Sequence, residues 1–272
     1  MSSQDLPLYR TGTSQTLPRS PGPVFIYEPT ISLLARPSFQ QPSHLSVNWI
    51  GDSTDGEQLA EFAGRLCYMS QKNPASRTTR EYLENIKRQG HGSVLEHANY
   101  SLLFEGVSRS LTHELVRHRA GFSFSQLSQR YVDESEANFV VPPAIIGDEA
   151  LEASWRNQIE GAQSAYVALV AQLMDSYSWV PDRVHRRKMA REAARGVLPN
   201  STETKIVVTG NARAWRTMLE LRTSEGAELE IRRLSVATLR LLQAEAPGFF
   251  SDFDIYPAPD RRDAARVQYH KV

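Results

Sequence analysis

The sequence has little cysteine, no long apolar run and no excess of charge. Cys67 is the only cysteine among 272 residues, which excludes an intrachain disulfide and any metal site built from several cysteines. No apolar run approaches the roughly 20 residues that span a bilayer. The N-terminus "MSSQDLPLYR" lacks the apolar stretch of a secretory signal. These absences favour a cytoplasmic protein that does not cross a membrane.

Charge of one sign is also missing, because 31 Lys and Arg balance 31 Asp and Glu. Proteins that bind nucleic acid generically usually carry excess positive charge, so bulk nucleic-acid binding is disfavoured. Only five of the basic residues are lysines, which leaves 26 arginines. Codon usage is one explanation. The other is that the planar guanidinium suits phosphate and carboxylate groups, and composition alone does not separate the two.

Proline is concentrated at one end of the chain. Residues 1–45 contain seven of the fifteen prolines, with serine and glutamine between them. Because proline disfavours helix interiors and central strands, this segment is predicted to be an extended, partly disordered arm. Residues 46–256 are predicted to form a single compact domain. Residues 257–272 are charged and are predicted to be a loose tail.

The remaining patterns predict a mixed α/β protein of the α+β kind, with a mixed sheet and long helices. Strands are expected at 46–51, 98–106, 139–146 and 203–210. Helices are expected at about 57–69, 77–88, 107–117, 148–177, 182–195, 211–222 and 226–246. No GxGxxG motif and no regular βαβ alternation is present, so a Rossmann sheet is not expected.

Cysteine-based and serine-based catalysis are disfavoured. The helix at 57–69 has an apolar stripe that runs from Leu59 through Phe62 to Cys67, which predicts a buried and inert thiol. The sequence has neither a GxSxG elbow nor a Walker loop. An enzyme with this sequence would therefore need a cofactor for difficult chemistry.

The densest polar cluster is "RHRAGFSFSQLSQRY", from Arg117 to Tyr131. Arg117 and Arg119 can complement the dipole at the C-terminal end of the preceding helix. That explanation leaves the serines, Arg130 and Tyr131 unexplained. Guanidinium forks and hydroxyl groups together are suited to phosphate oxygens, so the cluster indicates an anion site.

A second cluster, "HGSVLEH", holds His91, Glu96 and His97. The spacing is not that of a strong metal motif, so no metal is expected. The preferred interpretation is a glycine-rich turn in which the Ser93 hydroxyl caps the backbone N–H of Glu96.

Arginines also recur on two predicted helices. Arg187, Arg191 and Arg195 are spaced four apart and form one row, which is either a solvated face or an anion site beside Arg195. Arg222 continues the apolar stripe of Trp215 and its neighbours. A partly buried guanidinium needs a partner, such as the carboxylate of Glu225, or a ligand. Asn211 is placed to cap the start of that helix.

Four ordered motifs resemble the flavin-dependent thymidylate synthases. The cluster at 117–131 is similar to the signature of that family, an RHR triplet followed by Ser-x-Arg-Tyr. The resemblance extends to "GHGSVLEHA" before it and to "ARGVLP" and "GNARAWRTMLELR" after it, over about residues 90–222. Eight residues separate the triplet from Ser128, one more than in the usual form of the signature.

The resemblance implies a homotetramer with shared active sites, FAD as cofactor, NADPH as reductant, methylenetetrahydrofolate as carbon donor and dUMP as acceptor. Carried over by motif, the FAD residues are Ser93, Arg117, His118, Arg119, Asn211 and Arg213, with Gln126 and Thr217 nearby. The dUMP residues are Glu114, Arg117, Gln126, Ser128, Arg130, Arg195 and Arg222. The family's matching arginine contacts the pyrimidine, which makes Arg222 the candidate catalytic residue.

Two rival interpretations remain. One is a non-catalytic, arginine-rich module that binds nucleotides or nucleic acid; zero net charge and the lack of a basic stripe interleaved with aromatics disfavour it. The other is a flavoprotein that uses folate to methylate RNA, which the absence of a Rossmann fingerprint leaves without support.

Overall fold

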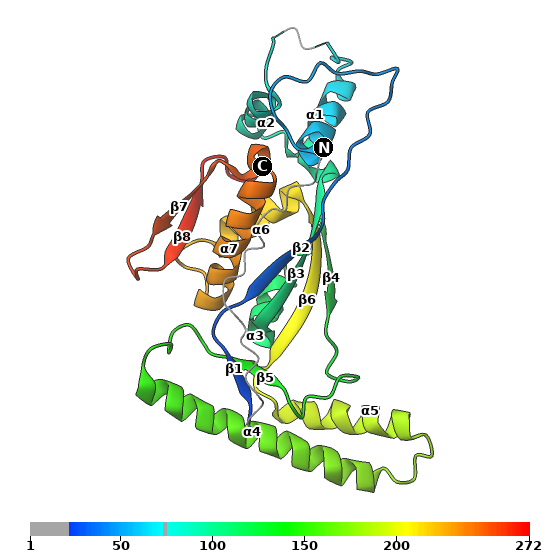
Figure 1. Cartoon of the computed structure of the whole chain (residues 1–272), viewed down its shortest axis with the longest axis vertical. Helices are drawn as coiled ribbons and strands as arrows, with labels where there is room; N and C mark the ends of the chain where they lie inside the picture. The colour runs from blue at the N-terminus through cyan, green and yellow to red at the C-terminus, as the bar shows by residue number, and fades with distance from the viewer. Residues whose placement is uncertain (1–21, 73–74) are drawn as a thin grey trace, which may run out of the picture. The chain divides into compact units, whose positions relative to one another are not determined.

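The computed structural model describes residues 22–72 and 75–272, and it has the mixed α+β architecture that the sequence predicts (Figure 1). Its strands are β1 (Val24–Ile26), β2 (Thr30–Ala35), β3 (Asn99–Ser108), β4 (Phe122–Gln126), β5 (Asn138–Val140), β6 (Glu203–Asn211), β7 (Phe253–Pro257) and β8 (Asp263–Val267). Its α-helices are α1 (Asp55–Cys67), α2 (Thr79–Arg88), α3 (Arg109–Leu115), α4 (Glu149–Ser176), α5 (Arg183–Ala194), α6 (Ala212–Arg222), α7 (Leu229–Glu245) and α8 (Pro247–Phe250). The 3-10 helices are η1 (Gly92–His97) and η2 (Arg195–Val197).

The largest sheet has the strand order β2-β3-β6-β4. In two smaller sheets, β1 pairs with β5 in parallel and β7 pairs with β8 antiparallel. Strands adjacent in the large sheet are far apart along the chain, so its topology is not the repeated βαβ unit of a Rossmann fold.

The chain divides into two compact units. Within the described residues, the first unit comprises 22–30, 104–114 and 125–206. Within it, Ala137, Phe139 and Ile159 form a buried cluster against which Phe25 and Trp155 pack. The long helix α4 and helix α5 are joined by a short loop and lie side by side (Figure 1).

Within the described residues, the second unit comprises 31–72, 75–103, 115–124 and 207–272, and it buries the aromatic side chains of Tyr100, Trp215, Phe249 and Phe250. Trp215 on α6 is fully buried, and its indole Nε1 donates to the backbone oxygen of Tyr100, 3.3 Å away. The Phe122 ring packs edge-on against Trp215 with a centroid separation of 5.0 Å. These contacts fix the start of β4 beside α6.

Several helices begin where their capping residues predict. Thr54 with Glu57 and Thr78 with Glu81 form complete capping boxes at α1 and α2. Asn211 caps α6, because its Oδ1 accepts the N–H of Ala214 at 2.8 Å. The predicted role of Asn211 as a helix cap is therefore confirmed.

The predicted burial of α1 is wrong. Cys67 is exposed, and the neighbouring Leu66 is 41% exposed. The buried face instead contains Gly56, Ala60 and Gly64, together with the ion pair of Glu61 and Arg65. Small residues allow the hydroxyl groups of Tyr100 and Tyr82 to approach the helix closely at Gly56 and Gly64. Close packing of small residues and a paired charge therefore decide which face is covered, rather than the apolar stripe.

Two other predictions about the fold, the strand at 46–51 and the loose C-terminal tail, need correction. Residues 46–51 form no strand, whereas β4 lies inside the cluster at 117–131, where no strand was predicted. The predicted loose tail is wrong for β8, which pairs with β7 and buries Ala264, Ala265 and Val267. Residues 1–21 of the predicted N-terminal arm lie outside the described residues, and 24–35 contain β1 and β2. The domain limits 46 and 256 stay a prediction.

Within residues 22–72 and 75–272, no helix combines the length and apolar character needed to cross a membrane. The same described residues contain no group of three or more His, Cys, Asp or Glu side chains arranged to hold a metal ion.

Candidate active site

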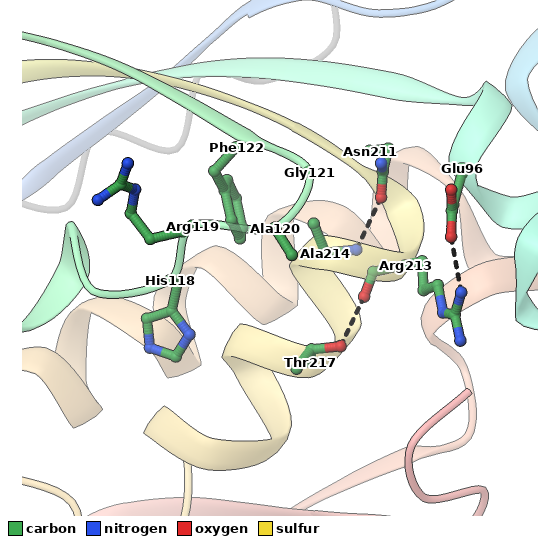
Figure 2. A pocket seen from close by; sticks show the side chains of 10 residues that line it. All are labelled: Glu96, His118, Arg119, Ala120, Gly121, Phe122, Asn211, Arg213, Ala214 and Thr217. Carbon is green, nitrogen blue, oxygen red and sulfur yellow. Dashed lines mark hydrogen bonds and ion pairs between the residues drawn. The ribbon is translucent and has the colours of Figure 1, made fainter.

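A cavity of about 390 Å³ opens in the second unit (Figure 2). Three short segments line it: the end of η1, the turn that follows α3, and the first two turns of α6. The lining residues are Glu96, His118, Arg119, Ala120, Gly121, Phe122, Asn211, Arg213, Ala214 and Thr217. Its volume lies within the range of about 300–1,000 Å³ that is common for small-molecule sites.

The turn before β4 depends on Gly121. Its φ angle is +75°, a conformation that L side chains rarely adopt. A Cβ atom there would lie 2.7 Å from Asn211 Nδ2 and 2.9 Å from Ala214 Cβ. The backbone oxygen of Gly121 also accepts the N–H of Asn211, 3.2 Å away. A glycine is therefore required for the turn to reach the start of α6.

Helix α6 presents polar groups to the cavity. Arg213 Nη1 lies 2.6 Å from Glu96 Oε1, and both side chains are substantially exposed (Figure 2). The Thr217 hydroxyl donates to the backbone oxygen of Arg213, 3.0 Å away. Arg119 is also among the lining residues. Two arginines and the N-terminus of an 11-residue helix make the cavity suited to an anionic ligand.

His118 and Arg222 form a direct hydrogen bond in the second unit. Arg222 Nε donates to His118 Nε2, 3.0 Å away, and both residues are half-buried. Burial, together with the smaller effect of the positive charge of Arg222, lowers the pKa of His118 to about 4. The Oε1 atom of Glu225, which the sequence suggested as a partner of Arg222, accepts the hydroxyl of Tyr256 at 2.8 Å.

A second polar group lies in the first unit, where β4 ends. Gln126 Nε2 donates to the hydroxyls of Thr112 and Thr204, at 3.2 and 3.3 Å. The Arg130 guanidinium pairs with Glu192 at 3.0 Å. The backbone N–H of Arg130 donates to Ser128 Oγ, 3.4 Å away. These bonds hold Gln126, Ser128 and Arg130 in defined positions at the end of β4 and in the segment that follows it.

The three arginines of the predicted row, Arg187, Arg191 and Arg195, lie in different environments on α5 and at its C-terminal end. Arg187 is exposed, whereas Arg191 Nη1 donates to the backbone oxygen of Tyr131 at 2.7 Å and Arg191 Nη2 lies 2.5 Å from Asp133. Arg195 ends α5 and is half-buried. Burial lowers the pKa of Arg109, Glu134 raises it, and the neighbouring charge of Arg195 lowers it. The proximity of two guanidinium groups supports the anion-site alternative at Arg195.

Glu134 is a buried carboxyl group that the sequence did not reveal. It is 4% exposed, and its Oε1 has no hydrogen-bond partner among the described residues. Burial raises its pKa to about 7. No local pattern marks it, because its burial depends on residues distant in sequence, such as Tyr166, whose hydroxyl accepts the backbone N–H of Glu134.

Comparisons with known proteins agree with the motifs. The family model described as "thymidylate synthase complementing protein" matches residues 50–248. A flavin-dependent thymidylate synthase from Mycobacteroides abscessus is 48% identical over 237 residues, which is 86% of this chain and 94% of that protein. Proteins of the same name from Mycobacterium sp. strain JLS and Mycobacterium tuberculosis are 50% and 47% identical, each over 86% of this chain and 94% of theirs.

The chain belongs to the flavin-dependent thymidylate synthase family. A solved structure has the same fold, with a TM-score of 0.61 and 22% identity over 84% of this chain and 95% of its own. That protein is a UMP/dUMP methylase, PolB from Streptomyces cacaoi, in complex with 5-Br dUMP. At this identity, the likeness establishes the fold alone.

The expected family residues divide between the two units. His118, Arg119, Asn211, Arg213 and Thr217 line the cavity. Ser93, Arg117 and Arg222 belong to the same unit but do not line the cavity. Ser93 and Arg117 are exposed, and Arg222 is half-buried. The first unit contains the remaining expected residues, Glu114, Gln126, Ser128, Arg130 and Arg195.

The expected cap by Ser93 is wrong, because η1 begins without a side-chain capping bond. The 3-10 geometry brings the buried Val94 and Leu95 into the core and leaves Ser93 exposed. Sequence reasoning missed Glu96 as a partner of Arg213. The two belong to different motifs and are 117 residues apart, so neither motif alone could have signalled the contact.

Proposed function

We propose that this chain catalyses the reductive methylation of dUMP to dTMP. Methylenetetrahydrofolate supplies the carbon and is released as tetrahydrofolate, and NADPH supplies the reducing equivalents. FAD, when bound, carries the hydride between NADPH and the transferred carbon. The observation that supports this most directly is the cavity that joins the RHR triplet to the start of α6, because two family motifs separated in sequence meet there.

The cavity residues fit a flavin dinucleotide. Arg119 and Arg213 provide guanidinium groups for the phosphates, and the start of α6 adds backbone N–H groups. Asn211 lines the same wall while its Oδ1 caps the helix, so its position is fixed. The exposed Ser93 and Arg117 remain expected contacts of the cofactor.

The first-unit residues fit the phosphate and sugar of a nucleotide. Ser128 provides a hydroxyl and Arg130 a guanidinium within one turn of chain. Arg109 and Arg195 bring two positive charges together, which an anionic ligand would offset. Gln126 provides an amide held by two threonine hydroxyls, and Glu114 lies half-buried on α3. Arg222 is assigned to the pyrimidine, where a cation favours negative charge on the ring and makes its C5 carbon more nucleophilic.

The chain is proposed to act as a cytoplasmic homotetramer with active sites shared between subunits. Several large apolar side chains are exposed, which supports burial against other copies. Tyr68, Met69, Trp179 and Val184 are 78%, 68%, 71% and 72% exposed.

The decisive experiment supplies the purified protein with labelled dUMP, methylenetetrahydrofolate and NADPH and looks for labelled dTMP. Omission of NADPH or of the folate should abolish the product. The protein should be yellow, and NADPH should bleach its flavin absorbance. A colourless protein that binds oligonucleotides and makes no dTMP would favour the arginine-rich binding module instead.

A further inference from the structure

The His118–Arg222 hydrogen bond connects two parts of the proposed site. His118 lines the flavin cavity and lies in the turn after α3, and Arg222 is the last residue of α6. The donor is the Nε–H of the guanidinium, and the acceptor is Nε2 of the ring, 3.0 Å away. The two residues are 104 positions apart in the sequence, so their contact depends on the folded second unit.

The direction of this bond determines the protonation state of the ring. Arginine stays protonated in proteins, so its Nε always donates. His118 Nε2 must then present a lone pair, and a neutral ring with that lone pair carries its proton on Nδ1. The depressed pKa of His118, about 4, agrees with a neutral ring at physiological pH.

We propose that His118 is a positioning residue for Arg222. By accepting the Nε–H, His118 holds one edge of the planar guanidinium, so that the opposite edge with its two Nη groups is presented in a fixed orientation. This inference rests on the proposed role of Arg222 at the pyrimidine of dUMP. An arginine on a long, flexible side chain would otherwise sample several orientations, and misplacement by about 1 Å can lower a rate a hundredfold.

The same geometry gives His118 two separable functions. Nε2 orients Arg222, whereas Nδ1–H remains a donor on a residue that lines the flavin cavity. Glutamine places its amide oxygen as many bonds from Cα as Nε2 is, so His118→Gln keeps an acceptor for Arg222. Asparagine places its amide group at the level of Nδ1, so His118→Asn keeps only the cavity-side group. His118→Ala keeps neither.

We expect His118→Gln to retain kcat within about fivefold of the wild type, and His118→Asn and His118→Ala to lose about a hundredfold. The KM for dUMP should rise in His118→Asn while its FAD content after gel filtration stays near that of His118→Gln. Combining His118→Asn with Arg222→Ala should lower kcat no further than Arg222→Ala alone does, because both changes remove the same His118–Arg222 interaction. His113 is exposed on α3 and provides the matched control, since His113→Gln should change none of these values.

A readout independent of turnover tests the contact itself. Nitrogen NMR of isotope-labelled histidine should show His118 neutral with its proton on Nδ1 at pH 7.5, and Arg222→Ala should shift it toward the Nε2–H form. A charged ring or an Nε2–H tautomer in the wild type would overturn the proposal. So would equal kcat in His118→Gln and His118→Asn. Failure of the wild type to form dTMP while the NMR result holds would count against the proposed function and leave the His118–Arg222 contact established.

Discussion

Arg216 and Asp252 form a bidentate ion pair inside the second unit. Arg216 Nη1 lies 2.7 Å from Oδ1 and Nη2 lies 2.9 Å from Oδ2, and Arg216 is only 2% exposed. Lys87 adds a third contact, with Nζ at 2.8 Å from Oδ1. This network anchors the middle of α6 to the C-terminal segment. Substitutions on the exposed side of α6 and at its end should therefore change the site without unfolding the helix.

Arg222→Ala should stop dTMP formation while FAD stays bound and NADPH still reduces it. A cation positioned beside developing charge contributes about a hundred- to a thousandfold in rate. Arg222→Lys should recover only part of the loss, because lysine keeps the charge but lacks the planar fork. Stopped-flow reduction of the flavin and a dTMP assay at saturating dUMP separate the two half-reactions. Near-normal turnover of Arg222→Ala would show that Arg222 has only a structural role as a partner of His118.

Arg119→Ala should lose FAD more readily than Arg130→Ala does. Arg119 lines the cavity, whereas Arg130 pairs with Glu192 in the first unit. The ratio of flavin to protein after gel filtration is the measurement. Arg130→Ala should instead raise the KM for dUMP. Equal flavin loss in the two variants would show that the cofactor and nucleotide residues are not separable in this way.

Glu96→Gln should tighten FAD binding. The carboxylate of Glu96 holds Arg213 and places a negative charge in a cavity assigned to phosphate groups. Exposed ion pairs contribute at most about 1 kcal/mol, so the dissociation constant of FAD should fall by up to about fivefold. Titration of the apoprotein with FAD measures this. Glu105→Gln, which removes an exposed pair with Lys205, is the control and should leave FAD binding unchanged.

Glu134→Gln should stabilise the protein at pH 8 and not at pH 4.5. The pKa of Glu134 is raised to about 7, so between about pH 4.5 and 7 the folded chain keeps a proton that the unfolded chain releases. Stability from this group is therefore present at low pH and lost as pH rises through that window, by at most about 3 kcal/mol. Melting temperatures at the two pH values measure the difference, with the exposed Glu160→Gln as control. An equal shift at both pH values would contradict a buried, protonated carboxyl group.

Cys67→Ala should keep dTMP formation and change stability by less than about 0.5 kcal/mol, because the thiol is exposed and the hydride route passes through the flavin. Gly64→Ala is the contrasting variant on the same helix. Its new Cβ would collide with the Tyr82 hydroxyl and lie 3.3 Å from Val94, which should cost about 1–3 kcal/mol. Thermal unfolding and a dTMP assay test both variants. A folded, flavin-loaded Cys67→Ala without activity would show that the thiol takes part in the reaction.

Local patterns predicted the helices well, because their starts are encoded by adjacent residues. The cap of α6 by Asn211 and the capping box of Thr54 and Glu57 are formed within three residues. Strand β4 could have been recognised from its alternation: Phe122, Phe124 and Gln126 are half-buried, while Ser123 and Ser125 are exposed. The strand was missed because the arginines on either side of it were interpreted only as ligand-binding residues.

Tertiary contacts decided what local patterns could not. The buried face of α1 is the face with Gly56 and Gly64, where tyrosine hydroxyls approach the helix. A prediction based on the spacing of apolar side chains does not detect these glycines. Hairpin β7–β8 contains many charged residues, so its sequence looks like a solvated tail. One hydrogen-bond partner of Arg222 is a histidine from another motif, and only the fold brings the two together.

The turn at Ala120 and Gly121 has a consequence for how the signature motif tolerates changes in length. Side chains alternate between the two faces of a strand, so a residue inserted within β4 would reverse the parity of every position after it, including Gln126. A residue inserted in the preceding turn leaves that parity intact, provided that a glycine occupies the left-handed position. The additional residue between Arg119 and Ser128 can thus be absorbed before the strand begins. The motif can therefore gain a residue in the turn at Ala120 and Gly121 during evolution. The serine hydroxyls and the Gln126 amide of β4 then still point to the same faces of the sheet.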